Sequence, residues 1–384
     1  MERPPRDIYV KSNSFETLAG HLPGGEEALH RIADLMTRLP EMDLPPDRLA
    51  VVDKACRALT GDATEGEPTF ELKVHICEEI RHISDADLAR YLFYRYRYDV
   101  YPEIKRIDAF PPCVQIEPTS ICNYRCVFCY QTDKSFTQGR HGHMGMMSLD
   151  TFKSVVDQIE GEVEAVTLAS RGEPLMCRGI GDMLSYLEGK FLGLKMNTNA
   201  WFLTEDLAHR ILQTGFNTLV FSVDAAEPEL YARLRVNGQL ERVLANIKMF
   251  AEIRRKHYPD SQIITRASGV HFSDEQDFSE MQGFWSEYVD QVAFVDYNPW
   301  ENVYDTPPRD ITTPCSDLWR RMFIWWDGKA NPCDVDYKSH LCAGTVDTTD
   351  ISAIWRGESY QRLRDQHLAG NRQAVAPCAS CAVI

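Results

Sequence analysis

The sequence predicts an α/β protein whose central domain, residues 111–300, is a parallel sheet of six strand–helix units. Two observations support this prediction. Six short β-rich segments alternate with segments of helical periodicity. Each β-rich segment is also nearly continuous in apolar residues, as expected for strands buried on both faces. Such a sheet is either open or curled into a partial (β/α)6 barrel. We expect a helical region over residues 1–110 and a small α+β domain over residues 301–384.

The first 110 residues contain three segments with apolar residues at helical spacing: EEALHRIADLMTRL, PDRLAVVDKACRAL and DADLARYLFYRYRYDVY. Residues 61–69, GDATEGEPT, are rich in Gly, Pro and polar side chains and are therefore predicted to form a loop. The sequence assigns no role to this region.

Six strands are predicted in the central domain, at residues 113–118, 164–170, 193–199, 217–224, 262–270 and 290–298. The first helix between them is expected to start after an N-cap at Ser148, with Phe152, Val155, Val156 and Ile159 on one face. Later helices are expected in TEDLAHRILQTG, QLERVLANIKMFAEIRRKH and DEQDFSEMQGFWSEY. In sheets of this kind the chemistry lies at the carboxyl ends of the strands.

Residues 301–384 combine a hairpin and a helix. RRMFIWWDGKANPC contains an aromatic strand, a turn at Asp327-Gly328 and a short return strand. ISAIWRGESYQRLRDQHLAG is predicted to be one helix that ends at Gly370.

The composition narrows the class of protein. The 384 residues carry a net charge of -16, which disfavours nucleic acid as a partner because its phosphates would be repelled. No apolar run reaches the roughly 18 residues of a transmembrane helix. Residues 1–15 contain no apolar stretch that resembles a signal peptide. We therefore expect a cytoplasmic protein with no nucleic-acid and no membrane partner.

The twelve cysteines are unevenly distributed. In a reducing compartment, so many cysteines indicate metal binding or catalysis rather than disulfides. One group lies within eight residues, in CNYRCVFC, and consists of Cys122, Cys126 and Cys129. A second group lies in the C-terminal domain and consists of Cys315, Cys333, Cys378 and Cys381, with Cys342 as a possible replacement for one of them. Four others are predicted to be packing residues: Cys56, Cys77, Cys113 and Cys177.

The C-x3-C-x2-C spacing places three thiolates on the loop after the first predicted strand. A cubane cluster has four irons, so three local cysteines leave one iron open to a small molecule. With Phe128 as the aromatic residue before the last cysteine, this motif resembles the signature of the radical S-adenosylmethionine (SAM) superfamily. The alternatives are a zinc loop or reduced core cysteines.

The resemblance implies a 4Fe–4S cluster on Cys122, Cys126 and Cys129 whose open iron binds the amino and carboxylate groups of SAM. Reductive cleavage of SAM then yields a 5'-deoxyadenosyl radical, which abstracts hydrogen from a substrate. The resemblance also implies SAM contacts from the loops after the next strands. These contacts are assigned to Phe128, Gly172, Glu173, Asn197, Ser222, Asp224 and Arg266.

Several of these positions differ from the family pattern or have a second interpretation. Arg171 replaces the first glycine of the family's Gly-Gly-Glu-like loop, and Ala200 replaces a glycine that usually follows the Asn197 loop. Glu173 is alternatively a helix-capping acid. Arg266 suits the carboxylate of the cosubstrate, and is alternatively part of a structural ion pair. No catalytic acid or base is identified.

The second cysteine group resembles the auxiliary-cluster extension of the same superfamily, in the SPASM type or its shorter "twitch" form. Cys315 and Cys333 flank Gly328 as C-x12-G-x4-C, and Cys378-x-x-Cys381 follows close to the end of the sequence. The resemblance implies one complete auxiliary 4Fe–4S cluster, so that the protein would hold two clusters. Zinc on the same four cysteines is the alternative.

These features together predict a radical SAM enzyme of the oxidoreductase or lyase/epimerase type. We expect it to oxidise, epimerise or eliminate from a carbohydrate or nucleotide sugar, with the auxiliary cluster in electron transfer. An external donor such as flavodoxin or ferredoxin would supply electrons. The helical N-terminal region favours a small molecule over the first alternative, modification of a peptide or protein side chain by a ribosomal peptide maturase. The second alternative is a non-enzymatic iron–sulfur or zinc module.

Overall fold

A ten-stranded sheet runs through the computed structural model, which describes residues 16–17, 25–300 and 303–384. All six predicted strands of the central domain are present and are mutually parallel, in the sheet order β9-β8-β6-β5-β4-β2. Their bounds are β2 (Cys113–Ile116), β4 (Ala165–Leu168), β5 (Gly193–Thr198), β6 (Thr218–Ser222), β8 (Ile264–His271) and β9 (Gln291–Asp296).

The remaining strands extend both edges of this core. β1 (Glu16–Thr17) pairs antiparallel with β9, and β10 (Arg321–Ile324) pairs parallel with β2. Beyond β10 lie β11 (Lys329–Asn331) and β12 (Gly344–Thr345). Because β2 and β9 pair with these added strands, the six-stranded core does not close on itself in the described part of the chain. A separate two-stranded sheet joins β3 (Arg125–Cys126) to β7 (Arg235–Val236).

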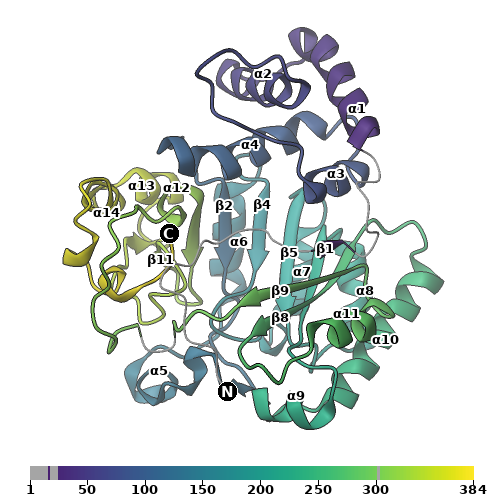
Figure 1. Ribbon diagram of the computed structural model, residues 1–384, viewed down its shortest axis with the longest axis vertical. Coiled ribbons are helices and arrows are strands. Elements are labelled where there is room, and N and C mark those ends of the chain that lie inside the picture. The colour runs from purple at the N-terminus through teal and green to yellow at the C-terminus, as the bar shows by residue number, and fades with distance from the viewer. Residues whose placement is uncertain (1–15, 18–24, 301–302) are drawn as a thin grey trace.

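Helices cover the outer face of the parallel strands (Figure 1). The predicted N-cap is confirmed, because the Ser148 side chain accepts a hydrogen bond from the Thr151 N–H. The covering helices are α6 (Leu149–Ile159), α7 (Ile180–Leu187), α8 (Glu205–Thr214), α9 (Pro228–Leu234), α10 (Leu240–His257) and α11 (Phe278–Ser286).

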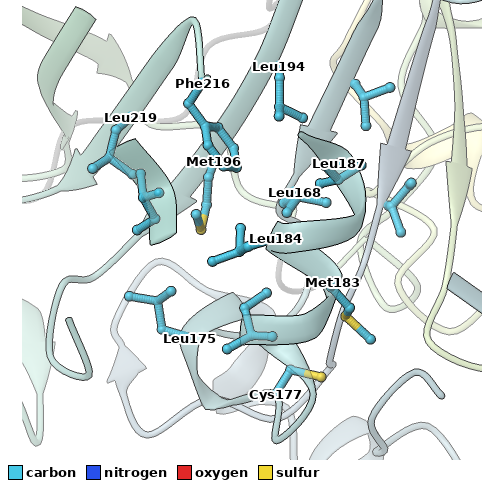
Figure 2. Packing of buried hydrophobic residues seen from close by; sticks show 14 of the residues in the cluster. Leu168, Leu175, Cys177, Met183, Leu184, Leu187, Leu194, Met196, Phe216 and Leu219 are labelled. Atoms are coloured by element: carbon cyan, nitrogen blue, oxygen red, sulfur yellow. The ribbon is translucent and has the colours of Figure 1, made fainter. Parts of the chain in front are cut away.

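The core between this layer and the sheet is formed by alternate strand residues. Figure 2 shows Leu168, Leu194 and Met196 of the strands against Leu184 and Leu187 of α7. Each of these side chains is buried. Burial of one such side chain contributes about 1.5–3 kcal/mol, so this layer holds the sheet in place. The intervening strand residues face the other side, which is the interior of the curled sheet.

The N-terminal region is helical, as predicted, and covers the amino ends of the strands. Its hydrophobic cluster includes Cys113 and Ala165, the first residues of β2 and β4. Arg90 also pairs with Glu164 just before β4, Nε to Oε1 2.8 Å. The helices are α1 (Gly25–Arg38), α2 (Pro46–Thr60), α3 (Val74–Arg81) and α4 (Leu88–Ile104), of which the eight-residue α3 was not predicted. The predicted loop at 61–69 is confirmed.

The C-terminal region differs from the prediction in one helix. The turn at Asp327-Gly328 is confirmed, with Gly328 at φ +77°. The expected single helix is instead split at Gly357, where the backbone is extended. A Cβ at that position would meet the Ala353 carbonyl oxygen at 2.9 Å. The helices here are α12 (Asp317–Arg320), α13 (Ile351–Arg356) and α14 (Glu358–Leu368).

Short helical turns complete the described chain: α5 (Lys134–Thr137), η1 (Leu39–Glu41), η2 (Tyr130–Thr132), η3 (Gly139–His141), η4 (Pro174–Met176), η5 (Arg372–Ala374) and η6 (Cys378–Ser380). Among the described residues, none of the helices has the length and apolar character needed to cross a membrane.

Candidate active site

The loop that carries Cys122, Cys126 and Cys129 leaves the carboxyl end of β2 and is held by the β3–β7 sheet. In this sheet Cys126 and Arg235 are direct cross-strand neighbours. The Arg235 guanidinium donates toward the Cys126 sulfur, with Nη1 and Sγ 3.8 Å apart. The cysteine loop is therefore tied to the segment that follows β6.

A cavity of about 230 Å³ lies beside this loop and is lined from the carboxyl ends of β2, β4, β5 and β6. These four strands are adjacent in the sheet, which explains why their loops converge. The lining includes many of the residues selected from the sequence: Cys122, Cys126, Phe128, Cys129, Gly172, Glu173, Asn197 and Ser222. Asp224 and Arg266 are not part of this lining.

The three cysteines suit a soft-metal cluster. Burial raises the pKa of the Cys122 thiol to about 12 and that of Cys126 to about 11, and it also raises the pKa of Cys129. Their apolar surroundings include Tyr124 and Phe128. Three sulfur ligands in such a shell fit an iron–sulfur cluster, which supplies the positive charge that buried thiolates need. Within the described ranges, no three His, Cys, Asp or Glu side chains are gathered as one metal ion would require.

Gly172 and Glu173 form the cavity wall after β4. A Cβ on Gly172 would lie 2.3 Å from the Thr119 carbonyl oxygen, so only glycine fits there. The Glu173 carboxylate accepts hydrogen bonds from the Thr198 hydroxyl at 2.6 Å and from the Asn199 N–H at 2.7 Å. It also caps η4, which is the alternative role considered above. Burial raises the pKa of Glu173, while these hydrogen bonds oppose the rise.

Arg171, which stands where the family has a glycine, is buried and ion-paired. Its guanidinium binds the fully buried Glu117 carboxylate, with Nε–Oε2 2.7 Å and Nη2–Oε1 2.5 Å. Its Nη1 donates to the Tyr337 carbonyl oxygen at 2.9 Å, and it lies 4.2 Å from the Trp325 ring centroid. Arg171 thus joins the cavity loop to the C-terminal region.

Asp224 and Arg266 lie apart from the cavity lining. Asp224 is fully buried, pairs with Arg235 and accepts a hydrogen bond from the Val270 N–H at 2.6 Å. Arg266 donates from Nε to Gln291 Oε1 at 2.7 Å, closer to the N-terminal helices. Burial lowers the pKa of Arg266 to about 10. Asp224 and Arg266 therefore have protein partners, and their SAM contacts stay predictions.

The second cysteine group is drawn together around Cys333. Burial raises the pKa of Cys333, and Cys378, Cys381 and Cys315 are close enough to raise it further. Arg372 donates to the Cys378 carbonyl oxygen at 3.0 Å and to the Cys381 carbonyl oxygen at 2.7 Å, which fixes the C-terminal pair. Cys342 is exposed and is not among the groups acting on Cys333.

An aromatic cluster lies between the two cysteine groups. Tyr130 stacks on Tyr337, with ring centroids 4.9 Å apart, and Phe136 packs against both. Cys129 of the first group packs against this cluster on one side. From the second group, Cys315, Cys333 and Cys381 do the same. The two cysteine groups are therefore connected through packed side chains.

The cavity is also lined by residues that the sequence did not indicate, among them Asn199, Arg235, Trp300 and Asp334. Trp300 donates from Nε1 to the Phe128 carbonyl oxygen at 3.0 Å. Asp334 directly follows Cys333 in the sequence. Its adjacency to a predicted cluster ligand could have indicated that it lies near the site. Ala200, which follows Asn199, has φ +59°, a conformation that favours glycine and that matches the glycine of the family pattern.

Comparisons with known proteins agree with this geometry. A radical SAM superfamily model matches residues 116–282, and a model of the SPASM iron–sulfur cluster-binding domain matches residues 315–382. The two matches together cover more than half of the chain.

Individual relatives are distant. The probable GTP 3',8-cyclase of Methanocaldococcus jannaschii is 25% identical over 144 residues, 36% of this chain and 45% of that protein. The mycofactocin maturase MftC of Mycobacterium tuberculosis is 24% identical over 160 residues, 42% of this chain and 39% of that protein. The chain thus spans less than half the length of these two curated relatives.

One solved structure shares the fold along most of the chain. Streptococcus suis SuiB, solved bound to the precursor peptide SuiA, is 15% identical, with a TM-score of 0.56 over 89% of this chain and 87% of that chain. At this identity the likeness concerns the fold alone. With the two family matches and the cysteine-lined cavity, the chain is a radical SAM enzyme with a C-terminal SPASM iron–sulfur domain, a family whose cofactors are 4Fe–4S clusters and S-adenosylmethionine.

Proposed function

We propose that this enzyme abstracts hydrogen from a small polar substrate, such as a carbohydrate or nucleotide sugar, and oxidises, epimerises or eliminates from it. One observation carries the proposal: the three cysteines share a cavity with polar side chains from the next three strands. When bound, the 4Fe–4S cluster supplies the electron that cleaves SAM to the 5'-deoxyadenosyl radical.

The chain's own residues would hold the reacting groups. Cys122, Cys126 and Cys129 would ligate the cluster. Glu173, already fixed by hydrogen bonds from its neighbours, would accept a hydrogen bond from the SAM amino group without having to move. Ser222 would contact the nucleoside from the adjacent loop. Such prearrangement lowers the barrier because little reorganisation is needed when SAM reacts.

The second cysteine group supports an oxidative outcome. Four cysteines would fully ligate an auxiliary cluster, which would accept one electron from a substrate radical after that radical loses a proton. The packed aromatic cluster keeps this group at a fixed position relative to the first one. An external donor such as flavodoxin or ferredoxin would reduce the enzyme.

Peptide modification is the second candidate. It is favoured by the names of two similar proteins, a mycofactocin maturase and a SuiB structure that contains a precursor peptide. In this chain the N-terminal helices lie on the amino ends of the strands, opposite the cavity. This arrangement leaves the small-molecule proposal as the better supported one.

Anaerobic SAM cleavage tests the proposal. Reconstituted enzyme with dithionite and SAM should form 5'-deoxyadenosine, measured by liquid chromatography. Cys126→Ala should abolish its formation, whereas Cys177→Ala, which removes a buried cysteine of the hydrophobic core, should retain it. Undiminished cleavage by Cys126→Ala would reject the assignment of the first cluster. Deuterated buffer would then identify the outcome, because epimerisation places solvent deuterium in the product.

A further inference from the structure

Two successive inward-facing residues of β5, Lys195 and Asn197, have unsatisfied hydrogen-bonding groups. Leu194 and Met196 alternate with them and pack into the core on the opposite face (Figure 2). The Asn197 Oδ1 is buried without a hydrogen-bond partner. The Lys195 ammonium makes no hydrogen bond or ion pair with any residue in the described part of the chain.

The position of Lys195 follows from that of Asn197. Asn197 lines the cavity beside the cysteines. Lys195 lies two residues earlier on the same face of the same strand, which is about 7 Å further into the curled sheet. Its side chain is only partly buried although β5 is central in the sheet, so it borders an interior space.

Two serines continue the same surface on the neighbouring strands. Ser222 of β6 and Ser268 of β8 are cross-strand neighbours, and both are partly buried. Their hydroxyl groups have no hydrogen-bond partner within residues 25–300 and 303–384. Ser222 also lines the cavity. We call these four residues, Lys195, Asn197, Ser222 and Ser268, the polar wall.

The charge around Lys195 is predominantly positive. Burial, Arg266 of β8 and Arg321 of β10 together lower the pKa of Lys195 to about 7, against the opposing effects of Cys113 and Glu79. Arg266 has Gln291 as a partner, and Arg321 has Asp317. An ammonium group near two guanidinium groups, with no ion pair of its own, costs free energy that either deprotonation or a bound anion relieves.

We infer that Lys195 and Ser268 of the polar wall bind the substrate of the radical reaction, next to the Asn197 and Ser222 side chains that would contact SAM, and that Lys195 binds an anionic group of this substrate, a carboxylate or a phosphate. The Ser268 hydroxyl suits a hydroxylated molecule, because it can donate and accept hydrogen bonds. The substrate class is therefore a small hydroxylated anion, such as a sugar acid or a sugar phosphate. That this ligand is the substrate rests on the proposed function.

Ligand-observed NMR tests the inference with two probes, acetate for the carboxylate and methylphosphonate for the phosphate. Anaerobically reconstituted enzyme should bind at least one of them saturably. Lys195→Met should weaken this binding at least tenfold, and it should fold because it replaces an unpaired, partly buried charge with an apolar chain. Lys195→Arg should retain most of the binding. The control Lys248→Met, on the exposed surface of α10, should bind as the wild type does.

The probe that binds shows whether the anionic group of the ligand is a carboxylate or a phosphate. Failure of both probes to bind, or equal binding by wild type and Lys195→Met, would overturn the inference. A separate measurement of 5'-deoxyadenosine by the wild type tests the proposed function. SAM cleavage without anion binding would remove this inference and leave the proposed function intact. Anion binding without SAM cleavage would reject the proposed function and leave only an anion site at Lys195.

Discussion

Removing one partner of the buried ion pair between Arg171 and Glu117 should strongly destabilise the junction of the central domain and the SPASM domain. Glu117 follows β2, and its carboxylate accepts hydrogen bonds from the Arg171 guanidinium and from the backbone N–H groups of Arg171 and Trp326. Arg171→Met removes the cation and retains an unbranched side chain. It leaves a fully buried carboxylate with two backbone donors at 3.1 and 3.2 Å.

The expected loss is large because the remaining charge cannot reach water. Breaking a buried pair by removing one partner costs about 3–5 kcal/mol. The hydrogen bond to the Tyr337 carbonyl oxygen and the contact with the Trp325 ring disappear as well. The double variant Arg171→Met/Glu117→Gln removes the uncompensated charge, and we expect it to recover about 2 kcal/mol. Arg48→Met, which breaks the partly exposed pair with Glu162, is the control and should lose less than about 1 kcal/mol.

Urea unfolding of the anaerobic holoenzyme, followed by circular dichroism, measures these differences. An unfolding free energy of Arg171→Met within about 1 kcal/mol of the wild-type value would refute this prediction, because a buried unpaired carboxylate should cost more than that. The prediction is also refuted if the separate effects of Arg171→Met and Glu117→Gln simply add in the double variant, because residues in direct contact should be coupled.

Three further predictions concern the metal sites and Lys195. Arg235→Gln removes a cation beside Cys126 and should lower the midpoint potential of the first cluster by on the order of 50 mV, measured by potentiometric EPR titration; an unchanged or raised potential would contradict this. Wild-type enzyme should contain about eight irons and eight sulfides per chain and Cys378→Ala about four of each; zinc in the second site would show that it is structural. The pKa of Lys195 is lowered to about 7 in the folded protein and lies near 10.4 in the unfolded chain, so between those values the unfolded state binds more protons and wild-type stability rises with pH. The stability advantage of Lys195→Met should therefore shrink by up to about 1.4 kcal/mol per pH unit from pH 7 to 9 in urea unfolding, and a constant difference would show that Lys195 titrates normally.

The sequence predicted the features that depend on local pattern. The six strands follow from continuous apolar runs, and the helix after Ser148 follows from periodicity and an N-cap. The cysteine spacing predicted the first metal site because all three proposed ligands lie on one loop. The convergence of Gly172, Glu173 and Asn197 followed from strand order in a parallel sheet.

Features that depend on long-range pairing were not visible in the sequence. β10 joins the edge strand β2 of the barrel sheet although some two hundred residues separate them. β7 has two residues, too few to give a strand pattern, yet it places Arg235 opposite Cys126. That pairing gives Asp224 an ion-pair partner and explains why this carboxylate does not line the cavity. Which strands and side chains pair at these sites depends on tertiary contacts rather than on local secondary-structure propensity.

The arrangement of the three regions on one sheet explains how two distant cysteine groups can act together. The N-terminal helices cover the amino ends of the strands. The first cysteine group and the cavity lie at the opposite, carboxyl ends. β10 continues the same sheet beyond β2, which carries the second cysteine group to the side of the first. Movement of the SPASM domain would have to break the β10–β2 ladder, the Arg171–Glu117 pair and the Tyr130–Tyr337 stack together. Because electron transfer is sensitive to separation, a junction held by three independent kinds of contact suits a reaction in which an electron leaves the substrate for the second cluster.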